Sequence, residues 1–115
     1  MLHIIIHFPR CTGHTRKKQL LTSIGSRASL KLDMEEKAVQ VILYESEFRS
    51  DTVQEDRDFF FIEVTSSRPL DGEKKQQLVE ILKDEVFNFS GICNDCVTIV
   101  IRTPEEGSYF GTRNA

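Results

Sequence analysis

The chain has 115 residues, of which 39% are hydrophobic and 29% are charged, and its formal net charge is −3 at pH 7. This size and composition indicate one globular domain, residues 1–115, and exclude a disordered chain. The net negative charge argues against nucleic acid as a partner, because phosphate binding needs a concentrated basic surface. The apolar runs are all too short to span a membrane.

The first half of the chain predicts a strand, a helix and a second strand. Residues 2–8 are apolar and β-branched and end at Pro9, which is typical of a strand. Residues 15–32 carry apolar side chains at helical spacing, and residues 38–45 resemble a strand again. The polar stretch at residues 46–58 is predicted to be a linker.

The second half predicts the same order of elements. Residues 59–65 form a strand, and Asp71 stands where a helix over residues 73–89 would begin. Residues 96–102 form the last long strand, and the glycines of residues 107–111 suggest a short hairpin or strand in the tail.

A shift of 58 residues relates the two halves. At this offset apolar positions coincide: Ile4 with Ile62, Leu20 with Leu78, Val39 with Val97, and Val41 with Ile99. A fixed offset implies one βαβ unit used twice, at about residues 2–45 and 60–103. Right-handed crossovers place both helices on one side of the sheet. We therefore predict an α+β fold, a two-layer α/β sandwich in which two helices cover one face of a four-stranded mixed sheet.

The other face of this sheet carries large apolar side chains that the helices cannot cover. They are Ile5, Ile42, Tyr44, Phe61 and Val100, interspersed with His3, His7, Gln40, Glu63 and Thr98. Exposed apolar patches of this kind usually mark an interface. We expect other copies of the chain to cover this face in a cyclic assembly.

Two segments resemble the tautomerase superfamily, which includes 4-oxalocrotonate tautomerase, 5-carboxymethyl-2-hydroxymuconate isomerase and macrophage migration inhibitory factor. The run Ser-Arg-Pro-Leu-Asp-Gly-Glu-Lys-Lys-Gln from Ser67 is similar to the Gly-Arg-Ser-x-Glu-x-Lys-type segment that opens a helix there. The start Leu-His-Ile-Ile-Ile from Leu2 resembles that family's Pro-His-hydrophobic start, except at its first position. The resemblance covers nearly the whole chain. It implies a homotrimer, a pocket near the N-terminus of each subunit and a small anionic organic acid as ligand.

The resemblance also implies the chemistry of that pocket. In the family an N-terminal proline acts as general base on a small keto or enol carboxylic acid, and arginines hold the substrate carboxylate. Leu2 occupies the proline slot here. Because leucine is bulky, we expect Met1 to be retained, and its primary amine can still accept a proton near neutral pH. Proline-based catalysis is therefore expected to be weak or lost, and we expect neither metal nor cofactor.

The candidate site residues follow from this comparison. Met1, through its N-terminal amine, and Leu2, in the proline slot, are the catalytic candidates. Arg68 stands in the helix-opening motif, Arg102 ends the last strand, and Tyr109 lies in a tail that would close a neighbour's site. These three are the candidates for substrate binding. Each also fits a structural role, as a surface arginine or an interface aromatic.

Two other functions stay open. A non-catalytic trimer would bind a small anion or a protein. A ferredoxin-like regulatory module, which shares the βαββαβ order of elements, would bind a small ligand.

The pair Cys93 and Cys96 has no second ligand pair for zinc, so these are expected to be free thiols. An odd number of cysteines without a secretion signal predicts a cytoplasmic protein.

Overall fold

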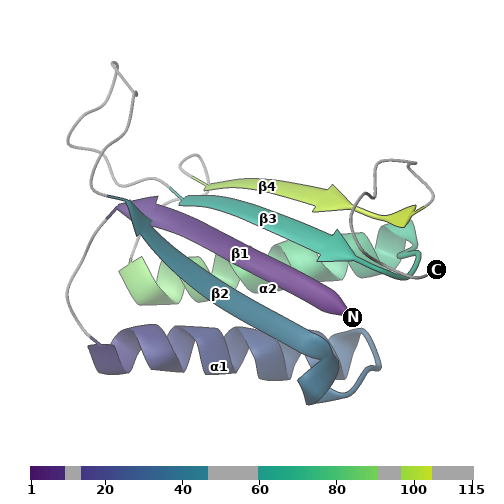
Figure 1. Ribbon diagram of the computed structural model, residues 1–115, viewed down its shortest axis with the longest axis horizontal. Coiled ribbons are helices and arrows are strands. Elements are labelled where there is room, and N and C mark those ends of the chain that lie inside the picture. The colour runs from purple at the N-terminus through teal and green to yellow at the C-terminus, as the bar shows by residue number, and fades with distance from the viewer. Residues whose placement is uncertain (10–13, 47–59, 91–96, 105–115) are drawn as a thin grey trace.

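The computed structural model describes residues 1–9, 14–46, 60–90 and 97–104 (Figure 1). Its elements, in chain order, are β1 (Leu2–Pro9), α1 (His14–Lys31), a short 3-10 turn η1 (Glu36–Ala38), β2 (Val39–Ser46), β3 (Phe60–Ser66), α2 (Gly72–Ser90) and β4 (Val97–Arg102). Every strand and helix boundary lies within one residue of the range predicted from the sequence. The linker beyond residue 46, the tail at residues 107–111 and the pair Cys93 and Cys96 fall outside the described residues.

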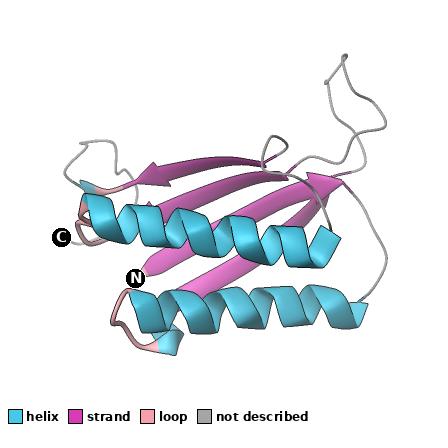
Figure 2. Ribbon diagram, turned by 180° about the vertical axis from the view of Figure 1, so that it is seen from behind, coloured by secondary structure: helices cyan, strands magenta, loops and turns pink. Residues whose placement is uncertain are grey.

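The four strands form one sheet in the order β2-β1-β3-β4. β1 is parallel to β2 and β3 is parallel to β4, whereas β1 and β3 are antiparallel. A ferredoxin-like module has a split βαβ unit, with another strand inserted between its two parallel strands. Here each parallel pair is directly hydrogen-bonded, so the ferredoxin-like alternative is excluded. The predicted four-stranded mixed sheet with two helices on one face is confirmed (Figure 2).

The pairing of β1 with β3 relates the halves by an approximate two-fold axis. Paired elements begin 58 residues apart, as in Leu2 of β1 and Phe60 of β3. Ile5 pairs with Glu63, which is its own equivalent at that offset, so the axis passes through this pair. The amino-terminal end of β1 therefore lies beside the carboxyl-terminal end of β3, where Leu2 pairs with Ser66.

The core fills the space between the sheet and the two helices. Alternate residues of β1 and β3 point into it, because successive side chains of a strand face opposite sides. Its most buried members are Leu2, Ile4, Ile6, Phe60, Ile62 and Val64 from the strands, and Ile24, Leu78, Leu82 and Val86 from the helices. Phe8 stacks on Phe60 with ring centroids 5.2 Å apart and meets the edge of the Phe89 ring at 5.9 Å. Neither helix among the described residues is long and apolar enough to cross a membrane.

The open face of the sheet, which the helices leave uncovered, has a polar centre within apolar surroundings. The side chain of His7 lies within 2.7 Å of the Glu63 carboxylate, which also accepts a hydrogen bond from Arg102 at 3.4 Å. The imidazole ring stacks on Tyr44 at 5.6 Å and lies 5.7 Å from Phe61. The predicted apolar side chains of this face are only partly buried in one chain, and Tyr44 is 53% exposed.

Candidate functional site

Met1 is held at the end of β1 by Ser67. The N-terminal amine donates a hydrogen bond to the Ser67 hydroxyl at 2.7 Å. That hydroxyl donates in turn to the Met1 carbonyl at 3.2 Å, and the backbone N–H of Ser67 donates to the same carbonyl at 3.1 Å. These contacts extend the β1–β3 ladder by one residue and give the amine a defined place at the edge of the sheet.

Leu2 is fully buried, with none of its surface exposed. Its side chain belongs to the core beneath the helices, as the alternation of β1 requires. It also contributes to the wall of a hollow beside Arg68. In this chain the residue in the proline slot is therefore a packing residue, and the chain end that offers an amine lies one position earlier, at Met1.

Arg68 lies immediately after β3, in a turn that Ser66 organises. The Ser66 hydroxyl donates to the Arg68 carbonyl at 2.6 Å and accepts from the Arg68 backbone N–H at 3.2 Å. Asp71 then caps α2, because its carboxylate accepts from the backbone N–H of Lys74 at 2.8 Å. The Arg68 side chain is exposed, and no carboxylate among the described residues forms an ion pair with it.

Arg68 lies between two adjoining hollows at this end of the sheet. The first, of about 580 Å³, is lined by Met1, Asp33, Met34, Glu35, Ala38 and Arg68. The second, of about 460 Å³, is lined by Leu2, Leu32, Asp33, Met34, Ser66, Arg68, Pro69, Leu70 and Lys74. A primary amine and a guanidinium without an ion-pair partner among the described residues thus share one hollow, and apolar side chains form the wall of the next.

Asp33 lines both hollows and was not foreseen from the sequence. It follows α1 in the left-handed conformation, with φ of 54°, and the bond from the Met34 N–H to the Ser29 carbonyl at 3.0 Å closes the helix end. Glycine is the usual residue at this position. An acid is also unfavourable there, because the carboxyl end of a helix carries partial negative charge. An aspartate directly after the predicted helix was the available signal, and such locally unfavourable residues cluster at functional sites.

Arg102 and Tyr109 are not brought to this hollow by the described residues. Arg102 lies on the open face of the sheet, where its guanidinium donates to Glu63. Tyr109 lies outside the described residues. Within one chain the structure therefore assembles Met1, Arg68 and Asp33, with Leu2 as part of the wall.

The charges at this end of the sheet are mixed. The Met1 amine, Arg68 and Lys74 are cationic, whereas Asp33 and Glu35 are acidic. A guanidinium with free N–H groups is suited to a carboxylate, which it can hold by two parallel hydrogen bonds. An amine beside it is placed to exchange a proton with the bound molecule.

Comparison with known proteins places the fold. No family model matches the sequence, and no curated protein matches it either. Among solved structures, Pt0534 inactivated by 2-oxo-3-pentynoate aligns with a TM-score of 0.80 at 17% identity, over 88% of this chain and 84% of that chain. A fused 4-OT, a wild-type symmetric trimer, aligns with a TM-score of 0.77 at 18% identity, over 88% and 84% of the two chains. Macrophage migration inhibitory factor of Toxoplasma gondii aligns with a TM-score of 0.77 at 16% identity, over 96% and 97%. The resemblance seen in the sequence is confirmed at the level of architecture: this chain has the fold of the tautomerase superfamily.

Proposed function

We propose that the hollow between Met1 and Arg68 binds a small keto or enol carboxylic acid and interconverts its tautomers slowly. The observation that supports this most directly is that the N-terminal amine, held by Ser67, and Arg68 line the same hollow. Pt0534, which shares the fold, is inactivated by a 2-oxo acid, and this supports the choice of substrate class.

The proposed reaction needs one base and one carboxylate anchor. Arg68 holds the carboxylate by charge-assisted hydrogen bonds. The neutral Met1 amine removes a proton from the carbon next to the keto group and leaves an enolate. The resulting ammonium then returns that proton to the enolate oxygen, so that the keto form becomes the enol with no other reactant. Asp33, at the rim of both hollows, disfavours acids that carry a second carboxylate.

Binding without turnover is the second candidate. Leu2 supplies no secondary amine and is fixed in the core. The primary amine of Met1 is already engaged as a donor to Ser67. A chain of this kind would keep the anion-binding role of Arg68 and lose the base.

The proposed assembly is a homotrimer in which the open faces of the three sheets meet. The uncovered apolar side chains of this face support it, and the fused 4-OT structure shows that this fold assembles into symmetric trimers. In this assembly Arg102, which lies on the open face of the sheet, would be at the interface between subunits.

The test uses 2-oxo-3-pentynoate as a probe of the amine. Addition of an amine to its triple bond has no leaving group, so the labelled peptide gains the full mass of the reagent. We expect peptide mass mapping to place this adduct on Met1. Intact mass of the untagged protein, measured first, checks that Met1 is retained.

Arg68→Met is the variant that separates the anchor from the base. Hydrogen bonds to charged groups contribute about 1.5–3 kcal/mol, so labelling should slow by about 10- to 150-fold. Lys18→Met removes an exposed cation of α1 that lines neither hollow and serves as the matched control. Labelling confined to cysteines, or equally fast labelling of the Arg68 variant, would refute the proposed site.

A further inference from the structure

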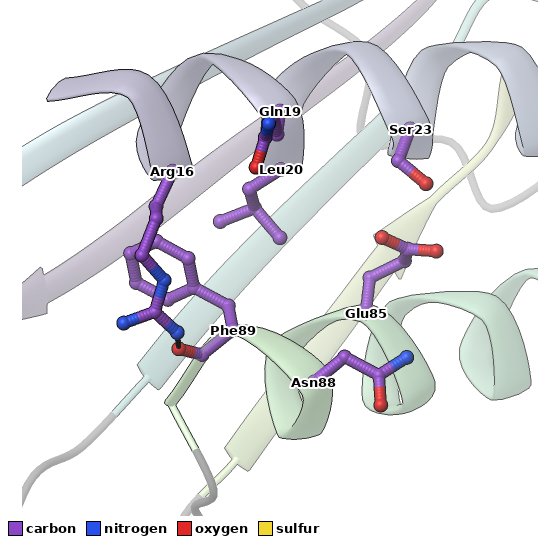
Figure 3. Close-up of a pocket in the computed structure, with 7 residues that line it drawn as sticks. All are labelled: Arg16, Gln19, Leu20, Ser23, Glu85, Asn88 and Phe89. Carbon is purple, nitrogen blue, oxygen red and sulfur yellow. Dashed lines mark hydrogen bonds between the residues drawn. The ribbon is translucent and has the colours of Figure 1, made fainter. Parts of the chain in front are cut away.

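A further hollow lies between the two helices, on the side of the molecule away from the open face of the sheet. α1 and α2 lie side by side over the sheet (Figure 2), and a groove of about 240 Å³ runs between them (Figure 3). Arg16 lies in the first turn of α1. Asp33, which lines the Met1 hollow, follows it by 17 residues in the chain. At 1.5 Å per residue they are separated by about 25 Å, so this groove is distinct from the proposed active site.

One end of the groove holds a nearly buried carboxylate. The Glu85 side chain is 11% exposed, and its Oε2 accepts a hydrogen bond from Arg27 at 2.7 Å. Arg27 also donates to Asp84 at 2.8 Å, and these bonds, that to Glu85 first, raise the pKa of the guanidinium. The other oxygen of Glu85, Oε1, accepts no hydrogen bond from the described residues.

The other end of the groove holds a cation in a fixed position. The Arg16 guanidinium lies over the Phe89 ring, 5.2 Å from its centroid, and donates through Nη2 to the Phe89 carbonyl. Figure 3 shows this contact at the carboxyl end of α2. Among the described residues no carboxylate pairs with Arg16, so most of its five N–H donors are available to a ligand.

Neutral polar groups line the groove between these two charges. The hydroxyl of Ser23 and the amides of Gln19 and Asn88 face the groove from the two helices (Figure 3). Within the part of the chain that the structure describes, none of the three side chains makes a hydrogen bond to another residue. Glu85 and Phe89, the residue that Arg16 contacts, are about one helical turn apart on α2, or about 6 Å along its axis.

We propose that this groove binds a small linear zwitterion of dipeptide size. Its ammonium group would donate to the Glu85 carboxylate and its carboxylate would accept from Arg16, while its peptide group would pair with the amides of Gln19 and Asn88. An extended dipeptide is about 7 Å long, which is comparable with the spacing of the two ends along α2. The site depends on neither Met1 nor Arg68 and is independent of the proposed tautomerase activity.

The binding test uses glycylglycine with the full-length protein. Amide resonances in two-dimensional NMR spectra are followed during titration, and saturable shifts are expected at residues of the groove, such as Ser23 and Asn88. N-acetylglycine lacks the ammonium group, and glycylglycinamide lacks the carboxylate. We expect each of these to bind at least about tenfold more weakly, a difference of about 1.4 kcal/mol. An absence of saturable shifts in the groove up to tens of millimolar glycylglycine would overturn the proposal.

A pair of neighbouring carboxylates provides the matched variants. Glu85→Gln and Asp84→Asn each remove one acidic partner of Arg27, but only Glu85 lines the groove. We expect Glu85→Gln to weaken glycylglycine binding by about tenfold or more and Asp84→Asn to change it by less than about twofold. Equal weakening in both variants would show that helix stability, and not the groove carboxylate, is responsible.

Two further variants, which differ in whether a larger side chain enters the groove, test the proposal if Glu85→Gln does not fold. Ser23→Leu fills the groove, whereas Thr22→Leu places the same side chain on an exposed neighbouring position. Loss of binding in Ser23→Leu alone supports the groove. Undiminished binding in both variants locates the ligand elsewhere and refutes the proposal. Arg16→Gln completes the set, because it should abolish the preference for glycylglycine over glycylglycinamide.

Discussion

Replacing Ile42 with aspartate tests whether the open face of the sheet is the subunit interface. Ile42 pairs in register with Ile5, and Ile5 pairs with Glu63 at the centre of the sheet. In one chain Ile42 is only partly buried, so an aspartate there would stay hydrated. The monomer should lose about 1 kcal/mol or less from weaker strand propensity and reduced apolar burial.

The cost is much larger if three such faces meet. An unpaired charge in a dry interface costs about 3 kcal/mol or more. Three copies then disfavour the trimer by about 9 kcal/mol, which lowers the association constant by more than six orders of magnitude. Because the association constant of a trimer depends on the square of the concentration, the midpoint of dissociation rises by about three orders of magnitude, so that a trimer with a midpoint near nanomolar would then have one near micromolar. Sedimentation velocity at about 0.1 micromolar protein, between these two midpoints, measures this directly.

Two controls separate the interface from general effects of the substitution. Leu30→Asp places the same charge at a residue of α1 that is 83% exposed, and it should leave the oligomeric state unchanged. Ile42→Val keeps an apolar β-branched side chain and should preserve the assembly. The reasoning fails if Ile42→Asp remains a trimer with an unaltered melting temperature, or if the native protein sediments as a monomer.

The other predictions concern the Met1 end of the sheet. Acetylation of the N-terminal amine should abolish any turnover of an enol acid such as phenylenolpyruvate, followed by its ultraviolet absorbance; fast turnover that survives acetylation would mean that another group is the base. Deleting Met1 together with Leu2→Pro should raise the rate by about a hundredfold if only the base is missing, and a folded trimer that gains nothing would favour the binding function. Asp33→Gly should stabilise the fold by about 1 kcal/mol, because it relieves both the left-handed backbone and the acid at the helix end, and should raise the melting temperature by about 4 °C. Asp33→Asn, which removes only the charge, should give part of that gain; a lower melting temperature for Asp33→Gly would contradict the helix-end argument.

The elements were predictable because their signals are local. The apolar alternation of β1 and the helical spacing around Leu78 each occur within a short window, and the 58-residue offset repeats them. The strand order was not local information. Both the tautomerase-like and the ferredoxin-like folds share βαββαβ, and only the direct pairing of β1 with β2 separates them.

The site was predictable only in part, for a related reason. Arg68 was found through a motif, and Met1 through its place at the start of the chain. The register between β1 and β3 brings them together, since it joins residues that are 66 positions apart, such as Met1 and Ser67. Asp33 was missed because its importance depends on where α1 ends and on which hollow that end faces. Arg102, which was predicted to bind substrate, illustrates the converse, because its position at a strand end did not reveal that Glu63 would hold it on the open face.

The two-fold relation between the halves explains why one chain has a single amine-bearing site. The axis through Ile5 and Glu63 gives the sheet two equivalent ends in terms of strand pairing. At the 58-residue offset the equivalent of Met1 is Phe59, which is bonded to residues on both sides and has no amine. Duplication of the βαβ unit in one chain therefore preserves the strand geometry at both ends but leaves the N-terminal amine at one. In the same way, Leu2 and its equivalent Phe60 are both fully or almost fully buried. The repeat thus keeps a large apolar residue at this core position, and this favours packing over an exposed N-terminal proline.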